Sequence, residues 1–251
     1  MLVMGILNVT PDSFADGGKH NDFESAVARG LELIEEGVDI IDIGGESTRP
    51  GADRVSEEEE IARTIPVIRE LAKHGAKISI DTMRASTAKA AINAGASIIN
   101  DVSGGLADPS MLQTAAELKV PYIAMHWRGQ SKDMNSRAVY GDVVNDVISE
   151  LQERISAALD AGITAEHLII DPGLGFAKDA DHNWAIIDAI DKFVALGYPV
   201  LVGASRKRFL GGDTPDAREQ ATIDLTKRLA PTGVWAVRVH SVEPHKEVLS
   251  V

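Results

Sequence analysis

Acidic, amide and basic side chains cluster where short apolar runs of this sequence end. Asp81, Asn100 and Asp171 each stand at or beside the end of such a run, and Arg238 and His240 close the last one. Carboxylates accept hydrogen bonds, whereas amides both donate and accept them, so this mixture suits the polar edge of a flat heterocycle. The cationic pair suits an anion. These residue types predict a small-molecule site with two different parts.

Eight apolar runs separated by helical patterns must position these side chains. Such a repeat predicts an α/β fold, a single (β/α)8 TIM barrel, whose active site lies at the carboxyl ends of its strands. A length of 251 residues is typical of one such barrel, so we expect one domain over residues 1–251. The expected strands are Leu2–Leu7, Val38–Ile43, Lys77–Asp81, Ser97–Asp101, Val120–Met125, His167–Asp171, Pro199–Gly203 and Val234–Val239.

The intervals carry helix signals. Asp22 is the expected cap of a helix that runs to about Glu36, and Ser56, with Glu59 three residues later, is a capping-box candidate. Ala85–Ala94 is predicted as a short helix and Val143–Ala161 as the longest one. The polar stretch from 129 to 142 reads as a flexible strand-to-helix loop.

Composition excludes several classes of function. A net charge of −13 argues against broad binding to nucleic acid or to anionic membranes. No apolar segment is long enough to span a bilayer, and the N-terminus lacks the basic region of a secretory signal. The chain has no cysteine, which excludes thiol catalysis and fits a reducing compartment. We therefore expect a cytoplasmic protein.

Familiar catalytic motifs fail on inspection. Gly173-Leu174-Gly175 is a partial glycine fingerprint, with Lys178 where a third glycine would be needed. Ser205 lacks the second glycine of a nucleophile elbow. His240 and His245 do not have the helical spacing of a zinc protease. Dinucleotide binding, serine hydrolysis and a zinc centre are all poorly supported.

Seven motifs, in order along the whole chain, together resemble the dihydropteroate synthase family. They are Gly5-Ile6-Leu7-Asn8-Val9-Thr10-Pro11-Asp12-Ser13-Phe14, Asp42-Ile43-Gly44-Gly45-Glu46-Ser47-Thr48-Arg49-Pro50-Gly51, Ser79-Ile80-Asp81-Thr82, Ile99-Asn100-Asp101-Val102-Ser103-Gly104-Gly105, Asp171-Pro172-Gly173-Leu174-Gly175-Phe176, Ser205-Arg206-Lys207 and Arg238-Val239-His240. The segments His126-Trp127-Arg128-Gly129 and Arg206-Lys207-Arg208-Phe209-Leu210-Gly211 look especially like the actinobacterial branch of that family.

The resemblance implies a transferase of folate biosynthesis. Members of the family join 6-hydroxymethyl-7,8-dihydropterin pyrophosphate to p-aminobenzoate, giving 7,8-dihydropteroate and pyrophosphate. It also implies a Mg²⁺ cofactor, inhibition by sulfonamides and a homodimer. No strong general base is expected, because an aromatic amine is already nucleophilic at neutral pH.

The resemblance also assigns roles to residues of this sequence. Lys207, Arg238 and His240 are the implied catalytic residues, the last two on the pyrophosphate side with Thr48. Asn8 is the implied Mg²⁺ ligand, and one amide oxygen is chemically adequate when phosphate oxygens and water complete the shell. The implied pterin contacts are Asp81, Asn100, Asp171 and Lys207, with Met125 and Phe176 as apolar walls. The implied mobile covers, Thr10–Gly18 and Gly44–Gly51, contribute Phe14, Ser47, Thr48, Arg49 and Pro50 to the p-aminobenzoate pocket.

Each of these residues also has a possible purely structural role. An Asp or Asn at a strand end often caps a helix or closes a turn, Asn8 suits the turn that follows it, and Arg238 suits an ion pair. Met125, Phe176 and Phe14 suit ordinary packing and loop positions. Two features depart from the family: Ser241 stands where aspartate is common, and the stretch after His240 is short for a full eighth helix.

Two other functions remain open at this stage. A pterin-binding methyltransferase barrel that presents methyl-tetrahydrofolate to a corrinoid protein would share Asp81, Asn100 and Asp171 but would not need Arg238 and His240 for pyrophosphate. A pterin-binding paralogue with weak or no catalysis would bind without turnover.

Overall fold

The structure is a closed barrel of parallel strands. The computed structural model describes residues 1–10, 18–46, 54–130 and 134–250, without the side chains of residues 18–22, 134 and 135. Within these ranges eight strands pair in the order β6-β5-β4-β3-β2-β1-β8-β7, and a bridge between Ile170 and Val200 joins β6 to β7. The strands are β1 (Leu2–Asn8), β2 (Ile40–Gly44), β3 (Ile78–Asp81), β4 (Ile98–Asp101), β5 (Tyr122–Met125), β6 (Leu168–Asp171), β7 (Leu201–Val202) and β8 (Ala236–Val239).

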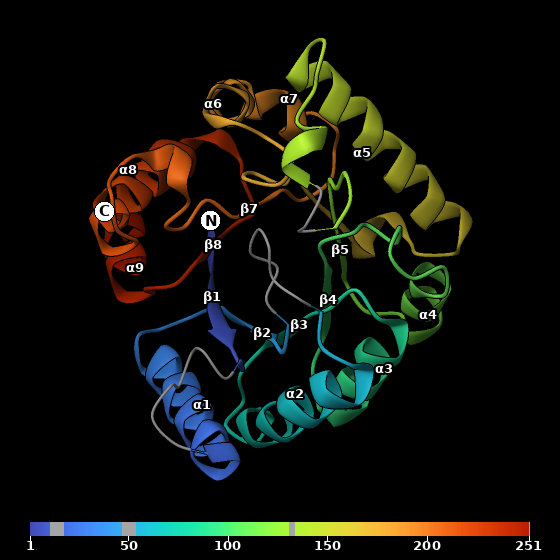
Figure 1. The fold of residues 1–251 in the computed structure, drawn as a ribbon, viewed down its shortest axis with the longest axis vertical. Helices are drawn as coiled ribbons and strands as arrows, with labels where there is room; N and C mark the ends of the chain where they lie inside the picture. The colour runs from blue at the N-terminus through green and yellow to red at the C-terminus, as the bar shows by residue number, and fades with distance from the viewer. Residues whose placement is uncertain (11–17, 47–53, 131–133, 251) are drawn as a thin grey trace.

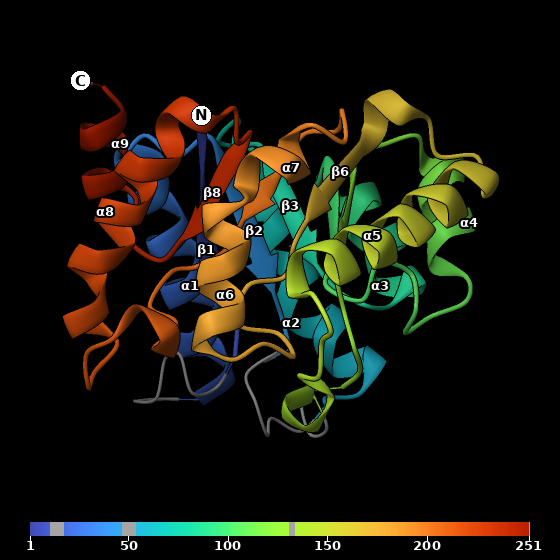
Figure 2. The same ribbon diagram turned by 90° about the horizontal axis from the view of Figure 1, so that it is seen from above.

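A ring of helices surrounds the strands (Figures 1 and 2). The α-helices are α1 (Gly18–Glu35), α2 (Glu57–Ala72), α3 (Ala85–Ala94), α4 (Met111–Leu118), α5 (Val143–Asp160), α6 (Ala180–Asp188), α7 (Ile190–Val194), α8 (Glu219–Leu229) and α9 (Glu243–Leu249). Short 3-10 turns occupy Met134–Arg137, Ala165–His167, Arg208–Leu210, Asp216–Arg218 and Ala230–Thr232.

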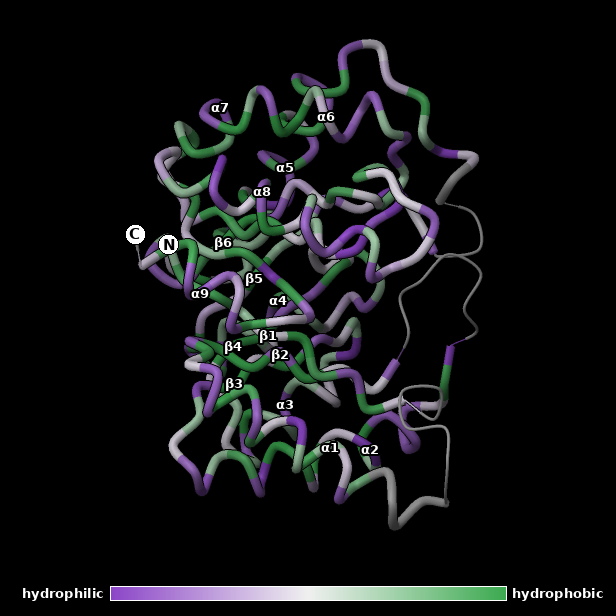
Figure 3. Tube along the Cα trace, turned by 90° about the vertical axis from the view of Figure 1, so that its left-hand side faces the viewer, coloured by the Kyte–Doolittle hydropathy of each residue, from purple (hydrophilic) through white to green (hydrophobic). Residues whose placement is uncertain are grey.

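Two apolar layers result from the alternation of side chains along the strands. One set of residues points outward and packs against the helices, forming the main core. The other set points inward and fills one end of the barrel, so the barrel is a packed core and not a pore. This inner plug consists of Met4, Ile40, Ile98, Ile123, Ile169, Leu201 and Ala236. Hydrophobic segments accordingly run along the strands, and polar stretches interrupt the helices (Figure 3).

The predicted barrel is confirmed, and the differences lie at element ends. Helix α1 begins at Gly18, so the prediction that Asp22 caps it is wrong: Asp22 lies inside the helix. Ser56 does cap α2, because its hydroxyl accepts from the Glu59 N–H at 3.2 Å. Strand β7 is shorter than predicted, with only Leu201–Val202 in regular pairing. The predicted helix over 85–94 is confirmed residue for residue, and Asp142 caps α5.

The C-terminal helix α9 is short, as the sequence predicted, but it is tied to the barrel. The Lys246 ammonium lies 3.0 Å from both carboxylate oxygens of Asp39, which directly precedes β2. Asp39 also accepts from the buried Val3 N–H at 2.7 Å. The Glu36 carboxylate accepts from the Val242 N–H at 3.1 Å. These contacts place both termini at one end of the barrel (Figure 2).

Within the described ranges, no helix is long and apolar enough to cross a membrane.

Replacement of Asp39 tests whether its contact with the Val3 N–H or its ion pair with Lys246 stabilises the end of the barrel where the termini lie. Asp39→Ala leaves a buried backbone N–H without its acceptor and should lower the free energy of unfolding by about 1–3 kcal/mol. Lys246→Met removes only the partly exposed ion pair and should cost less than about 1 kcal/mol. Urea denaturation measures both values. Equal losses in the two variants would show that the ion pair, and not the backbone contact, is the stabilising one.

Candidate active site

The predicted polar residues form the layer directly above the inner plug. Those that lie on strands come two positions after an inward-facing residue of the same strand, so their side chains also point into the barrel, at the carboxyl end. Asn100 follows Ile98, for example, and Arg238 follows Ala236. The structure therefore brings together five residues expected from the sequence: Asp81, Asn100, Met125, Asp171 and Arg238. Asp42, to which the sequence assigned no role, lies in the same layer.

Arg238 lies at the centre of this layer. Its Nε donates to Asp42 Oδ2 at 2.6 Å and its Nη2 to Asp81 Oδ2 at 2.8 Å. Asn100 Nδ2 also donates to Asp42 Oδ2, at 3.0 Å. Burial opposes the charge of the guanidinium, but the Asp42 and Asp81 carboxylates outweigh burial and raise the pKa of Arg238. The predicted ion pair of Arg238 is thus real, and it lies within the predicted site.

The Asp81 carboxyl is poised between its two protonation states. Burial raises its pKa to about 7, and the neighbouring carboxylate of Asp42 adds to that rise. The Arg238 guanidinium acts in the opposite direction because it favours the ionised form. Near neutral pH, Asp81 therefore exists as both an acceptor-only carboxylate and a carboxylic acid.

Asp171 and Lys207 form the opposite side of the layer. Asp171 is buried, and its Oδ1 accepts from the Gly173 N–H at 2.7 Å. Burial raises the pKa of Asp171, while the Gly173 N–H and the Lys207 ammonium counter that rise. Burial also lowers the pKa of Lys207 to about 8. The Lys207 ammonium donates to the Leu174 carbonyl and lies 4.7 Å from the centre of the Phe176 ring.

A small apolar cluster borders these polar groups. Met125 is buried together with Met83 and Val102, and Phe176 packs against the cluster from its edge. Gly175 lies beside it at φ +77°, and a Cβ there would approach Lys207 Cδ to 2.8 Å. Glycine at this position therefore lets the lysine stem pass. Met125 and Phe176 fit the predicted apolar walls and also pack as ordinary core residues.

His240 is oriented by a residue that the sequence analysis set aside. Ser205 Oγ accepts from the His240 backbone N–H at 3.2 Å and lies 2.9 Å from His240 Nδ1. When the hydroxyl donates to Nδ1, the ring proton of a neutral histidine resides on Nε2. The neighbouring Ser241 Oγ accepts from Arg206 Nη2 at 2.9 Å, so the residue that departs from the family pattern has a defined partner.

Asn8 ends β1 with a half-buried side chain and lies opposite Gly44 in the strand register. A Cβ on Gly44 would lie 3.6 Å from Asp81 Oδ2, at an ordinary contact distance. The described residues contain no group of three or more His, Cys, Asp or Glu side chains that could hold a metal. Five of the predicted site residues lie outside the described residues: Phe14, Ser47, Thr48, Arg49 and Pro50.

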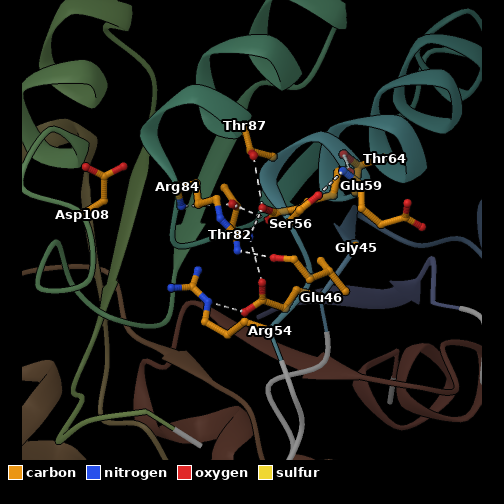
Figure 4. A network of polar contacts seen from close by, with 12 residues as sticks. Gly45, Glu46, Arg54, Ser56, Glu59, Thr64, Thr82, Arg84, Thr87 and Asp108 are labelled. Atoms are coloured by element: carbon orange, nitrogen blue, oxygen red, sulfur yellow. Dashed lines mark hydrogen bonds and ion pairs between the residues drawn. The ribbon is translucent and has the colours of Figure 1, made fainter.

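A buried ionic network lies beside this layer, at the start of α2 and α3 (Figure 4). Glu60 is its central residue and is 1% exposed. It accepts from Thr82 Oγ1 at 2.6 Å and from Thr87 Oγ1 at 3.1 Å. Arg84 Nη1 contacts Glu60 Oε2 at 2.5 Å and Glu46 Oε2 at 2.8 Å.

The same network reaches both ends of the β2–α2 connection. Glu46 precedes it and also accepts from Arg54 Nε at 2.9 Å, while Arg84 Nη2 donates to the Val55 carbonyl at 2.5 Å. The described ends of this connection are thereby fixed to α2 and α3.

Sequence reasoning missed some of these roles. Asp42 stands among the polar residues near the strand ends, but its function as the shared acceptor of Arg238 and Asn100 was not predicted. The available signal was the spacing of two from Ile40. Asp101 also ends a predicted strand, but its side chain faces away from the layer. Its carboxylate accepts from the Ser103 and Gly105 N–H groups and from the Tyr122 hydroxyl. For Asp101, the structural interpretation is the right one.

Comparison with known proteins agrees with this geometry. A family model described as pterin binding enzyme matches residues 4–240. Dihydropteroate synthase of Mycobacterium leprae is 48% identical over 99% of this chain and 91% of its own length. Dihydropteroate synthase of Bacillus subtilis is 47% identical, covering 96% of this chain and 84% of its own.

Solved structures give the same match. Xanthomonas albilineans dihydropteroate synthase with 4-aminobenzoic acid superposes with a TM-score of 0.93 at 44% identity, covering 99% of this chain and 90% of that one. The same organism's enzyme in complex with 7,8-dihydropteroate has a TM-score of 0.90 at 41% identity, covering 99% and 91%.

Adjacent glutamates on α2 provide a matched test of the buried network. Glu60→Ala removes one of the two carboxylates that pair with Arg84 and leaves two buried hydroxyl groups without their acceptor, so it should lower the free energy of unfolding by about 3–5 kcal/mol. Glu59→Ala breaks a partly exposed pair with Arg63 and should cost less than about 1 kcal/mol. Chemical denaturation with matched m-values is the measurement. A loss below about 1 kcal/mol for Glu60→Ala would contradict the central role of Glu60.

Proposed function

This chain belongs to the pterin binding enzyme family, and we propose that it catalyses the dihydropteroate synthase reaction. The substrates are 6-hydroxymethyl-7,8-dihydropterin pyrophosphate and p-aminobenzoate, and the products are 7,8-dihydropteroate and pyrophosphate. One observation carries the proposal: Arg238 donates to the Asp42 and Asp81 carboxylates of the layer, and its charge also acts on the Lys207 ammonium. A heterocycle that bears a leaving anion matches such a surface.

Recognition of the pterin falls to three side chains in the barrel. Ionised Asp81 and Asp171 accept hydrogen bonds from N–H groups of the heterocycle. Asn100 uses its Nδ2 on Asp42, which leaves its amide oxygen oriented as a further acceptor. Met125 and Phe176 contribute apolar contact with the ring. This combination is specific because an unpaired buried acceptor costs about 1–3 kcal/mol when the wrong ligand binds.

The chemical step is a dissociative substitution at the methylene carbon of the pterin. The C–O bond to pyrophosphate breaks first, and its electron pair leaves with the pyrophosphate. Lys207, Arg238 and His240 stabilise the negative charge that grows there, and the electron-rich dihydropterin ring delocalises the positive charge. The p-aminobenzoate nitrogen then forms the C–N bond and loses a proton. The chain needs no covalent intermediate and no strong base.

Mg²⁺ is part of the proposal. A single amide oxygen, that of Asn8, fits an ion that keeps most of its shell as water and pyrophosphate oxygens. Asn8 lies at the carboxyl end of β1 with a half-buried side chain. When bound, the ion neutralises charge on the leaving pyrophosphate.

Further parts of the proposal rest on the family alone. Phe14, Ser47, Thr48, Arg49 and Pro50 stay predicted contacts of p-aminobenzoate or pyrophosphate. Inhibition by sulfonamides follows if these drugs occupy the same pocket, and a Yersinia pestis dihydropteroate synthase solved with a sulfonamide drug complex has a TM-score of 0.93 to this chain. A homodimer and a cytoplasmic location are proposed on the same basis.

A turnover assay separates the proposed function from its alternatives. The synthase must release one pyrophosphate per pteroate formed, and only when both substrates and Mg²⁺ are supplied. A corrinoid-dependent methyltransferase would bind a pterin but release no pyrophosphate, and a silent paralogue would bind without turnover. Pyrophosphate release with both substrates present but without formation of 7,8-dihydropteroate would also contradict the synthase function.

Replacement of His240 and Asp171 should separate the two halves of the site. Asp171→Asn replaces a carboxylate oxygen that accepts hydrogen bonds with an amide that can place its NH2 group against an N–H of the pterin. It should weaken binding of 6-hydroxymethylpterin by roughly 10- to 100-fold. His240→Ala should leave that ligand nearly unaffected and weaken the pyrophosphate ester by roughly 10-fold or more. Calorimetry measures both, with the exposed His74→Ala as the matched control. Equal losses for both ligands in His240→Ala would contradict the division.

The pH profile of kcat/KM for the pterin pyrophosphate should be bell-shaped. It should rise through about 7 as Asp81 ionises to an acceptor, and fall above about 8 as Lys207 loses its charge. Lys207→Arg keeps the cation at all these pH values, so it should move the falling limb to higher pH. Steady-state rates from pH 6 to 10 are the measurement. An unchanged falling limb in Lys207→Arg would show that another group causes it.

A further inference from the structure

Lys178 is buried behind the loop that follows β6, and its ammonium has three acceptors. Nζ lies 2.9 Å from His126 Nδ1, 3.0 Å from the Gly173 carbonyl and 3.1 Å from the Phe176 carbonyl. The side chain is only 8% exposed. Burial lowers the pKa of Lys178 to about 7, and in the ammonium form each of its three hydrogens has an acceptor here. A lysine held in this way acts on the backbone that it contacts.

The two carbonyl contacts lead directly to the pterin half of the site. The Gly173 residue is held from two sides: its N–H donates to Asp171 Oδ1 at 2.7 Å, and its carbonyl accepts from Lys178. A Cβ on Gly173 would lie 2.4 Å from the His126 carbonyl oxygen, so this backbone has little room to shift. The second carbonyl belongs to Phe176, whose ring borders the apolar cluster and lies below the Lys207 ammonium.

A strained turn aims Lys178 inward. Ala177 has φ +49°, a left-handed conformation that costs a non-glycine residue about 1 kcal/mol or more. Its carbonyl accepts from the Tyr140 hydroxyl at 2.9 Å. The energetic cost of this turn is offset by the contacts that it permits, those of Lys178 above all.

His126 accepts the third hydrogen bond of Lys178, and its own contacts fix which ring nitrogen is the acceptor. Its Nε2 lies 2.9 Å from Glu150 Oε2, so Nε2 carries the proton and Nδ1 is the acceptor. Burial, together with the Lys178 charge, lowers the pKa of His126 to about 4, which keeps the ring neutral. Arg128 also pairs with Glu150, and its guanidinium lies 3.8 Å from the centre of the Tyr140 ring. The contacts therefore run from Lys178 through His126, Glu150, Arg128 and Tyr140 to Ala177, the residue that precedes Lys178.

We propose that Lys178 is a positioning residue for pterin recognition, which fixes the Asp171 carboxylate and the Phe176 ring through the carbonyls of Gly173 and Phe176. This inference rests on the proposed function in one respect, that the layer binds a pterin. Lys178 contacts the backbone behind the ligand site, and Asp171 and Phe176 make the contacts to the ligand.

Lys178→Met tests the proposal, because methionine keeps the unbranched stem, one atom shorter, and removes all three hydrogen bonds. The affinity for 6-hydroxymethylpterin, measured by calorimetry, should fall roughly 10- to 100-fold, as expected for lost charged hydrogen bonds. The KM for p-aminobenzoate should change by less than about threefold, because the residues assigned to its pocket belong to other segments of the chain. Lys192→Met, on the exposed side of α7, is the matched control and should change neither value.

A double-mutant cycle distinguishes positioning from general loosening of the fold. If Lys178 acts through Asp171, then Lys178→Met should weaken pterin binding much less in an Asp171→Asn background than in the wild-type chain. Equal losses in the two backgrounds, or unchanged pterin affinity in folded Lys178→Met, would overturn the proposal. If Lys178→Met does not fold, Tyr140→Phe replaces it, since it removes only the hydrogen bond to Ala177. A several-fold loss of pterin affinity is then expected, and unchanged affinity would overturn the proposal.

These readouts are independent of turnover. A wild-type chain that binds 6-hydroxymethylpterin but releases no pyrophosphate would contradict the proposed function and leave the positioning test intact. A wild-type chain that turns over normally, with unchanged pterin affinity in Lys178→Met, would contradict only the positioning role.

Discussion

The site depends on a largely buried cation, Arg238, which acidic side chains from neighbouring strands stabilise. Arg238 comes from β8, and its two carboxylate partners come from β2 and β3, with β1 between them in the sheet. An isolated guanidinium would not be tolerated in a barrel interior, because burial of an unpaired charge costs several kcal/mol. The three side chains meet only because the sheet closes through β1 and β8. Assembly of the site therefore requires the pairing of β1 with β8.

The same burial that makes Arg238 depend on its partners also tunes the groups around it. Desolvation raises the pKa of Asp81 to about 7 and lowers the pKa of Lys207 to about 8. The Asp81 carboxyl and the Lys207 ammonium, which carry opposite charges when ionised, thus both change protonation state close to neutral pH. The network around Lys178 and His126 keeps the backbone behind Asp171 in place. Electrostatic tuning and backbone positioning consequently act on the same small set of acceptors.

Much of this could be predicted from the sequence because strand alternation is periodic. The spacing from Ile98 to Asn100 and from Ile169 to Asp171 places the polar residues above the plug whatever the details of the loops. Asp101 shows the limit of the signal: one position from Asn100, it faces outward and orders a turn. Lys178 could not be predicted, because its direction depends on the left-handed Ala177. The start of α1 at Gly18 likewise depends on more than a capping residue type.

The central claim is that Arg238 physically couples the pterin acceptors to the anion side. The most direct test is the affinity for 6-hydroxymethylpterin measured by calorimetry with and without pyrophosphate and Mg²⁺, for the wild-type chain and for Arg238→Lys. Lysine keeps the charge but cannot bond Asp42 and Asp81 with a planar fork. The account predicts that pyrophosphate strengthens pterin binding to the wild-type chain by roughly 5- to 150-fold and that the variant loses most of this coupling. Equal coupling in both proteins would contradict it.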